Sequence, residues 1–178
     1  MRNESSIETL DIDIRILWVN HVLWTDSYID ALALGMDGLS YYNQRLHENI
    51  DDFFNLFNNH YGYTTANAMS TLLENHNLNQ IKFFVDFRSG NINTANMDRE
   101  ALRRNADETA RLLASINPHW DEETWRGLLY EHLRLTEDEL IYRIANNSSS
   151  RELASRAESQ GIQIAEYMAL GIKNQFYI

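Results

Sequence analysis

Residues 72–76 have the sequence LLENH, and fifty-six positions later residues 128–132 have the sequence LLYEH. The chain contains only six histidines, so the presence of two of them in similar five-residue segments at a fixed offset indicates a repeat. Around both words the apolar residues recur every three or four positions, which is the period of an α-helix. The two words therefore place two histidines on two predicted helices.

The similarity between these segments extends in both directions at the same shift and without a gap. The identical pairs are Leu46 and Leu102, Asn49 and Asn105, Asp51 and Asp107, Leu56 and Leu112, Leu72 and Leu128, Leu73 and Leu129, and His76 and His132. Because a fixed period is the mark of a repeated structural unit, we predict an internal duplication of a helical hairpin, with residues 46–90 repeated as residues 102–146.

Composition and periodicity predict an all-α protein. A chain of 178 residues with 44% hydrophobic residues is typical of a single domain, here residues 1–178. No segment has the alternating pattern of a strand. The periodic segments predict a six-helix up-and-down bundle, with helices over approximately residues 7–35, 40–59, 64–90, 98–116, 121–146 and 149–176.

Local signals predict where these helices begin and end. We expect Ser40, Asp121 and Ser149 to cap helices, the last of them in a capping box with Glu152. Pro118 disfavours helical geometry at the preceding residue and should end the fourth helix. The polar stretch GNINTANMD, residues 90–98, is predicted to be a linker.

Charge and cysteine content exclude several classes of function. The net charge of -11 argues against a nucleic-acid surface, which needs clustered Lys and Arg. The absence of cysteine excludes disulfides, thiolate metal sites and a cysteine nucleophile. The N-terminal sequence lacks the pattern of a signal peptide, and no apolar run is long enough to span a membrane. We therefore expect a cytoplasmic protein without a membrane partner; homo-oligomerisation is left open.

Each predicted helix offers one polar side chain to the centre of the bundle. His21, His76 and His132 lie among apolar residues of the first, third and fifth helices. The acids assigned to the inward faces of the second, fourth and sixth helices are Asp52, Glu108 and Glu158. Imidazole and carboxylate groups from facing helices are the ligands of non-haem metal sites. These six residues are therefore the predicted ligands of a divalent metal ion, Fe, Mn or Zn.

Two other interpretations of the same residues stay open. The histidines and acids could form a buried hydrogen-bond network that fixes the register of the helices in an interaction or small-ligand module. A helical enzyme that uses His76 or His132 as a general base is a third option. No nucleophile stands out beside them, so no catalytic residue is assigned and enzymatic activity is left open. Within single helices there is neither an H-x-x-x-H nor an E-x-x-H motif.

Several short segments resemble a family of small bacterial helical-bundle proteins. The segments are LWVNHVLWT (17–25), NADE (105–108), ASINPHW (114–120), LLYEHL (128–133) and GIKNQF (171–176). The resemblance implies an acid three residues after each repeated Asn, at Asp52 and Glu108. It also implies histidines in the last helix where this chain has Glu158 and Gln160.

Members of that family carry names such as glycosyltransferase and acetylglutamate kinase. A nucleotide-sugar enzyme would need an α/β fold with an acidic D-x-D loop, and a kinase would need a glycine-rich phosphate loop. The sequence shows neither motif, so we expect metal or small-ligand binding instead.

Overall fold

Helices make up almost all of the computed structural model, which describes residues 4–177. The six helices are α1 (Glu4–Leu34), α2 (Leu39–Tyr61), α3 (Tyr63–Arg88), α4 (Ile92–Ile116), α5 (Glu122–Ile144) and α6 (Ser150–Phe176). Between residues 4 and 177 there is no strand. The predicted all-α, six-helix architecture is confirmed.

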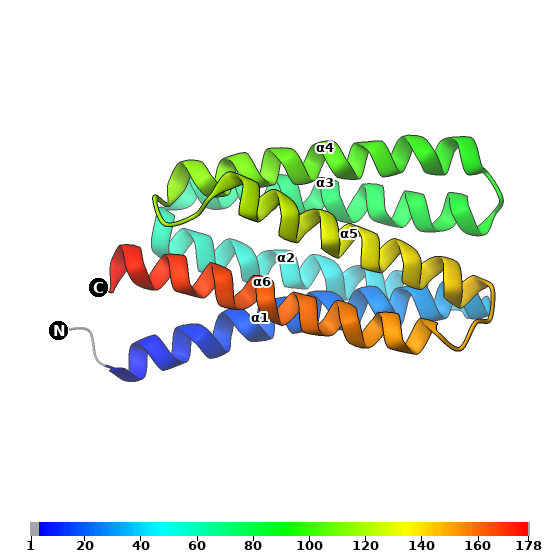
Figure 1. Cartoon of the computed structure of the whole chain (residues 1–178), viewed down its shortest axis with the longest axis horizontal. Helices are drawn as coiled ribbons and strands as arrows, with labels where there is room; N and C mark the ends of the chain where they lie inside the picture. Colours follow the sequence, from blue (N-terminus) through cyan, green and yellow to red (C-terminus); the bar gives the residue numbers. More distant parts are fainter. Residues whose placement is uncertain (1–3, 178) are drawn as a thin grey trace.

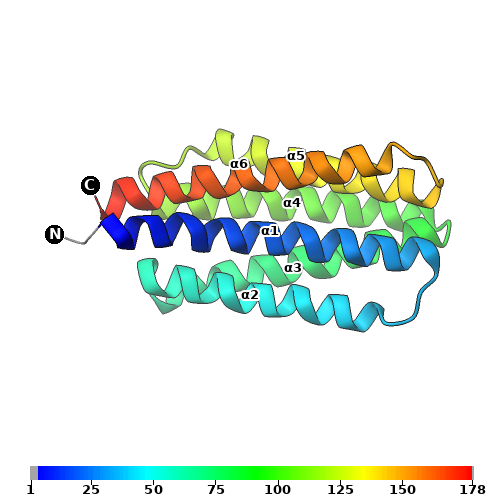
Figure 2. The same ribbon diagram turned by 90° about the horizontal axis from the view of Figure 1, so that it is seen from below.

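The helices run alternately up and down, and each packs against the next one along the chain (Figure 1). α6 also packs against α1, which closes the series into a ring, and the start of α1 and the end of α6 lie at the same end of the bundle (Figure 2). α1 makes further contacts with α3 and α5. Side chains of the three odd-numbered helices therefore meet inside the bundle.

Turn geometry fixes the short connections between the helices. Gly62 alone joins α2 to α3, and its φ of 81° lies in the left-handed region that favours glycine. Asn117 is extended, with φ -141° and ψ 117°, as expected before Pro118. The side chain of Asp121 accepts a hydrogen bond from the backbone N–H of Thr124 and caps α5 as predicted.

Two predicted boundaries and one predicted capping interaction are wrong. α4 already begins at Ile92, so most of the predicted linker 90–98 is helical and only three residues separate α3 from α4. The N-cap of α2 is Gly38, and Ser40 lies inside the helix. Within the described chain Ser149 makes no side-chain capping bond, so the predicted capping box with Glu152 does not form. Polar composition is a weak boundary signal where an apolar face continues through the segment.

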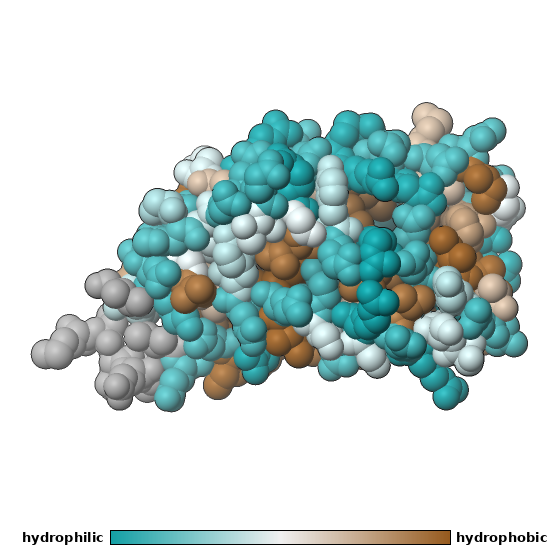
Figure 3. All heavy atoms as spheres, viewed as in Figure 1, coloured by the Kyte–Doolittle hydropathy of each residue, from teal (hydrophilic) through white to brown (hydrophobic). Residues whose placement is uncertain are grey.

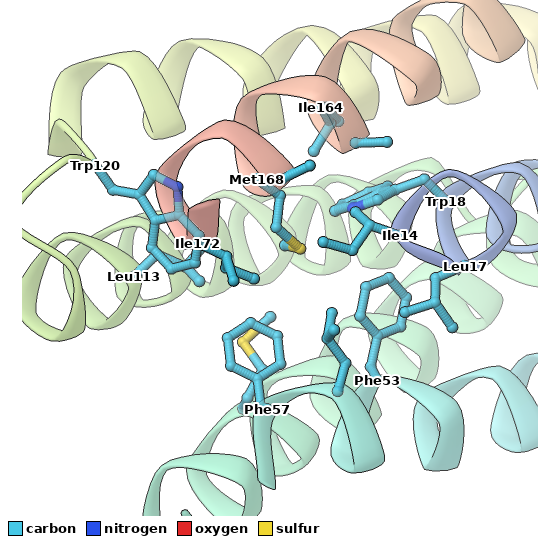
Figure 4. Packing of buried hydrophobic residues seen from close by; sticks show 14 of the residues in the cluster. Ile14, Leu17, Trp18, Phe53, Phe57, Leu113, Trp120, Ile164, Met168 and Ile172 are labelled. Carbon is cyan, nitrogen blue, oxygen red and sulfur yellow. The ribbon is translucent and has the colours of Figure 1, made fainter. Parts of the chain in front are cut away.

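The apolar core is divided into two main clusters along the bundle. The larger one surrounds Trp18, Phe57 and Met168 near the end that holds both termini (Figure 4). The second surrounds Phe83, Phe84 and Leu140 toward the opposite end. Seven and eight residues separate Phe83 and Phe84 from His76, so the histidine lies between the two clusters, where the sequence pattern places it.

The face of the molecule in Figure 3 is mainly hydrophilic, with apolar side chains scattered among polar ones. Among the helices of residues 4–177, none combines the length and the apolar character that crossing a membrane requires.

Candidate metal centre

Three imidazole rings from three helices meet inside the bundle. His21 on α1 lies 5.2 Å from His132 on α5 and 5.6 Å from His76 on α3, measured between ring centroids. The third pair, His76 and His132, is 6.2 Å apart. One ligand nitrogen from each ring can be chosen so that all of them lie within 4.8 Å of one another. The predicted convergence of the three histidines is therefore present.

The nitrogen positions are close to those of a metal site. Nε2 of His21 lies 3.2 Å from Nε2 of His132. Two nitrogens bound to one tetrahedral zinc ion at about 2.0–2.1 Å would lie about 3.3 Å apart. Nε2 of His76 is buried and has no hydrogen-bond partner among the described residues. The three ring nitrogens are therefore near enough to one another to hold a shared ion.

Burial keeps these imidazoles neutral, which is the form that binds metals. The pKa of His76 is lowered to about 3, mainly by burial and in addition by the neighbouring His132. Burial likewise lowers the pKa of His132 to about 4, although Gln160 opposes this shift. The pKa of His21 is also lowered well below 6.5, first by burial and then by His132 and His76. At neutral pH all three rings offer lone pairs rather than positive charge.

Side-chain amides from the even-numbered helices hold the histidine-bearing helices in register. Each amide donates to the carbonyl oxygen of the leucine four residues before a histidine. The three bonds are Asn49 Nδ2 to Leu17 O at 3.0 Å, Asn105 Nδ2 to Leu72 O at 2.9 Å, and Gln160 Nε2 to Leu128 O at 2.7 Å. In an α-helix the same carbonyl accepts the backbone N–H of the histidine. Each amide thus fixes the helical turn that carries a ring.

Gln160 has a second role beside His132. It is buried, and its interaction with His132 raises the pKa of that imidazole against the effect of burial. Nδ1 of His132 and Oε1 of Gln160 have no well-formed hydrogen bond within residues 4–177. A small movement would let Nδ1–H donate to Oε1. Metal-binding histidines commonly donate their second ring N–H in this way, which orients the ring and selects its tautomer.

A small apolar cavity adjoins the three rings. Its volume is about 40 Å³, and its walls include Trp18, Phe53, Met69, Trp125 and Leu129. A water molecule needs about 10–15 Å³, so the space holds a few water-sized groups beside the histidines. The walls offer few polar partners, which suits a ligand held by an ion rather than by hydrogen bonds.

The three acids predicted as ligands do not join the histidines. Asp52, Glu108 and Glu158 are exposed, and among the described residues the cluster that could hold an ion consists of the histidines alone. The prediction that these carboxylates face the interior is wrong. Viewed down its helix axis, each acid points roughly 100° away from the middle of the buried face. It is nevertheless only three or four residues from a buried position in the sequence.

Sequence reasoning also missed residues that support the site. On α6 the polar side chain that is buried beside His132 is Gln160, two residues from the predicted Glu158. The word LWVNH at residues 17–21 repeats the L-x-x-x-H spacing of residues 72–76 and 128–132. This third occurrence of the spacing indicates that α1 has the same relation between leucine and histidine as α3 and α5.

Comparison of the chain with protein-family models, with curated proteins and with solved structures finds no match. The assignment of a function therefore depends on the site itself.

Proposed function

We propose that the protein binds one divalent transition-metal ion through His21, His76 and His132. The observation that carries the proposal is the meeting of three neutral imidazoles from three helices with ligand nitrogens within 4.8 Å of one another. Imidazole nitrogen suits zinc, iron and other first-row ions.

Three protein ligands leave a coordination position for water or a small ligand. Structural zinc sites are closed by four protein ligands, whereas catalytic sites use three and keep one position open. An ion held here would lower the pKa of a bound water or polarise a bound ligand. The cavity of about 40 Å³ beside the rings gives that ligand room. The site thus has the form of a reactive or sensing centre rather than a structural one.

A hydrogen-bond network alone accounts less well for the same residues. One imidazole contact, between His21 and His132, is within hydrogen-bonding distance. Nε2 of His76 is buried without a partner in the described part of the chain. An unsatisfied buried polar group costs about 1–3 kcal/mol, and an ion would satisfy the inward-facing nitrogens.

Elemental analysis and cobalt spectroscopy test the proposal. Purified protein should carry close to one ion per chain, or should bind one Zn²⁺ or Co²⁺ after removal of its metal. His76→Gln should weaken binding by more than about 100-fold, because losing a partner of a ligand already costs about 10–100-fold. His47→Gln changes an exposed histidine and should bind normally. Protein that stays metal-free in excess Zn²⁺, Fe²⁺ and Mn²⁺ would contradict the proposal.

A further inference from the structure

A larger pocket lies on the other side of the histidine layer, between α4 and α5 and above α3. Its volume is about 340 Å³, within the range of about 300–1,000 Å³ that holds small molecules. Gln80 and Thr136 line it, and they lie one helical turn after His76 and His132. The pocket and the histidine cavity share one wall residue, Leu133.

The inner end of this pocket carries an unsatisfied amide. Gln80 is only 1% exposed. Neither its Nε2 nor its Oε1 has a hydrogen-bond partner among residues 4–177. Leaving a buried donor and a buried acceptor unpaired costs about 1–3 kcal/mol for each. A ligand that presents one donor and one acceptor side by side would satisfy both atoms.

The walls favour an apolar, uncharged body. Phe83, Phe84 and Leu102 line the pocket, so a flat hydrocarbon or aromatic group has surface to cover. The arginines at the rim already have acidic partners. These pairs are Arg99 with Glu137 at 2.5 Å, Arg134 with Glu131 at 2.7 Å, and Arg103 with Glu100 at 3.7 Å. A strongly anionic ligand would have to compete with these carboxylates.

The mouth of the pocket is kept open by a glycine within a helix. Gly127 lies in α5 and lines the pocket, and a Cβ built there would meet nothing within 4 Å. Glycine inside a helix costs about 1 kcal/mol relative to alanine. A longer side chain at this position has free space ahead of it at the edge of the pocket.

We propose that this pocket binds a small, uncharged organic molecule with an apolar body and an amide-type head, whose donor and acceptor pair with Gln80. The binding requires no metal ion, so it is independent of the function proposed above. The head would nevertheless lie one turn from His76. The site therefore has the position of a substrate pocket beside the candidate metal centre.

Fluorine NMR titration of the full chain with 4-fluorobenzamide tests the proposal. The probe has an apolar ring and a primary amide, and 4-fluorotoluene and 4-fluorobenzoate serve as comparisons without an amide head. Benzamide should bind saturably and at least about tenfold more tightly than fluorotoluene, the ratio expected when about 1.4 kcal/mol is gained at the head. Benzoate should bind more weakly than benzamide. Metal-free and zinc-treated protein should both show this order.

Two variants distinguish the contribution of the ligand's amide head to binding from that of the space in the pocket. Gln80→Leu should reduce the preference for benzamide over fluorotoluene to within about twofold, because the amide loses its partner. Gly127→Leu should weaken both ligands by at least about tenfold, because the new side chain fills the mouth. It should also preserve helicity, which circular dichroism checks, since leucine is a better helix former than glycine.

Three results would overturn the proposal. The first is the absence of saturable benzamide binding up to about 10 mM, where the binding free energy is only about 3 kcal/mol. The second is undiminished binding to folded Gly127→Leu. The third is an unchanged preference for the amide in folded Gln80→Leu. A protein that binds benzamide but no metal would support the pocket and contradict the metal site. A protein that binds metal but not benzamide would support the metal site and contradict the pocket.

Discussion

Nδ2 of Asn49 lies 3.0 Å from the carbonyl oxygen of Leu17, four residues before His21. The equivalent amide contacts occur before His76 and His132, from α4 and α6. Successive histidines are 55 and 56 residues apart, which is close to the repeat offset seen in the sequence. The three contacts favour a repeat unit that begins with α1 and occurs three times, rather than the pair 46–90 and 102–146. The duplication itself stays a prediction.

Gln160→Met should weaken metal binding by about 10–100-fold, the usual effect of losing a hydrogen-bond partner of a ligating histidine. Methionine has a similar length to glutamine but offers no amide oxygen as an acceptor to Nδ1 of His132. Isothermal titration with Zn²⁺ measures the change. Glu158→Gln is the matched control, because it alters an exposed side chain two residues away on the same helix. Equal losses in both variants would contradict a specific role for Gln160.

His76→Leu should leave the stability of the metal-free protein unchanged or raise it by up to about 2 kcal/mol, because it removes a buried nitrogen that lacks a partner. Urea unfolding measures this change. Zinc at about 100 times its Kd should add about 2.7 kcal/mol to the wild-type protein and nothing to the variant. A metal-free variant that is destabilised by several kcal/mol would favour the hydrogen-bond network instead.

The metal-free protein should lose stability as the pH falls below about 6.5. The pKa values of His76 and His132 are lowered to about 3 and about 4, so the unfolded chain binds protons that the folded chain excludes. The contribution is present above pH 6.5 and is lost as the pH falls toward the lowered values. Each histidine adds a slope of up to about 1.4 kcal/mol per pH unit. Urea unfolding between pH 4.5 and 7 should show a shallower slope for His76→Leu than for the wild type; equal slopes would count against neutral buried rings.

Glu139 should act on stability in the opposite direction. It is buried beside Arg143, which also pairs with Asp26 at 3.0 Å and with Asp30 at 2.7 Å. Burial raises the pKa of Glu139 well above 4.5, and the hydrogen bond and charge of Asp26 raise it further. This stabilising contribution is full below pH 4.5 and is lost as the pH rises through the raised value.

Replacement of Glu139 by Gln isolates that contribution. Glu139→Gln keeps a hydrogen-bonding group but removes the titrating proton. The stability of the variant relative to the wild type should therefore be greater at pH 8 than at pH 5. Urea unfolding at both pH values measures the difference. Parallel curves for the two proteins would show that Glu139 is ionised in the fold.

The sequence predicted the helices well because periodic burial dominates this fold. Every predicted helix is present, and Pro118 ends α4 as expected. The error at residues 90–98 arose because polar residues on an exposed helical face have the composition of a linker. Ala95 in that stretch is only 1% exposed. A prediction from composition alone does not detect such a buried position.

The candidate site was predicted only in part, for a geometric reason. Each of the three histidines follows apolar residues at both the third and the fourth position before it, which indicates that it points inward. Asp52 precedes the buried Phe53, but the two side chains point about 100° apart around the helix. A single acid at the edge of an apolar stripe therefore gives no reliable direction. Gln160 lies inside its stripe, yet an uncharged amide carries no obvious metal chemistry.

Gly171→Ala should destabilise the protein, although alanine is the better helix former. A Cβ at Gly171 would lie 1.9 Å from Nε1 of Trp120, whose ring packs between the loop after α4 and α6 and is 3% exposed. Overpacking costs about 1–3 kcal/mol, and this contact is close enough to exceed the roughly 1 kcal/mol that alanine gains over glycine in a helix. Gly127→Ala is the matched control: it also lies within a helix but meets nothing within 4 Å, so it should be stabilised by up to about 1 kcal/mol. Urea unfolding followed by tryptophan fluorescence compares the two variants. A stabilised Gly171→Ala would mean that Trp120 does not hold this position against α6.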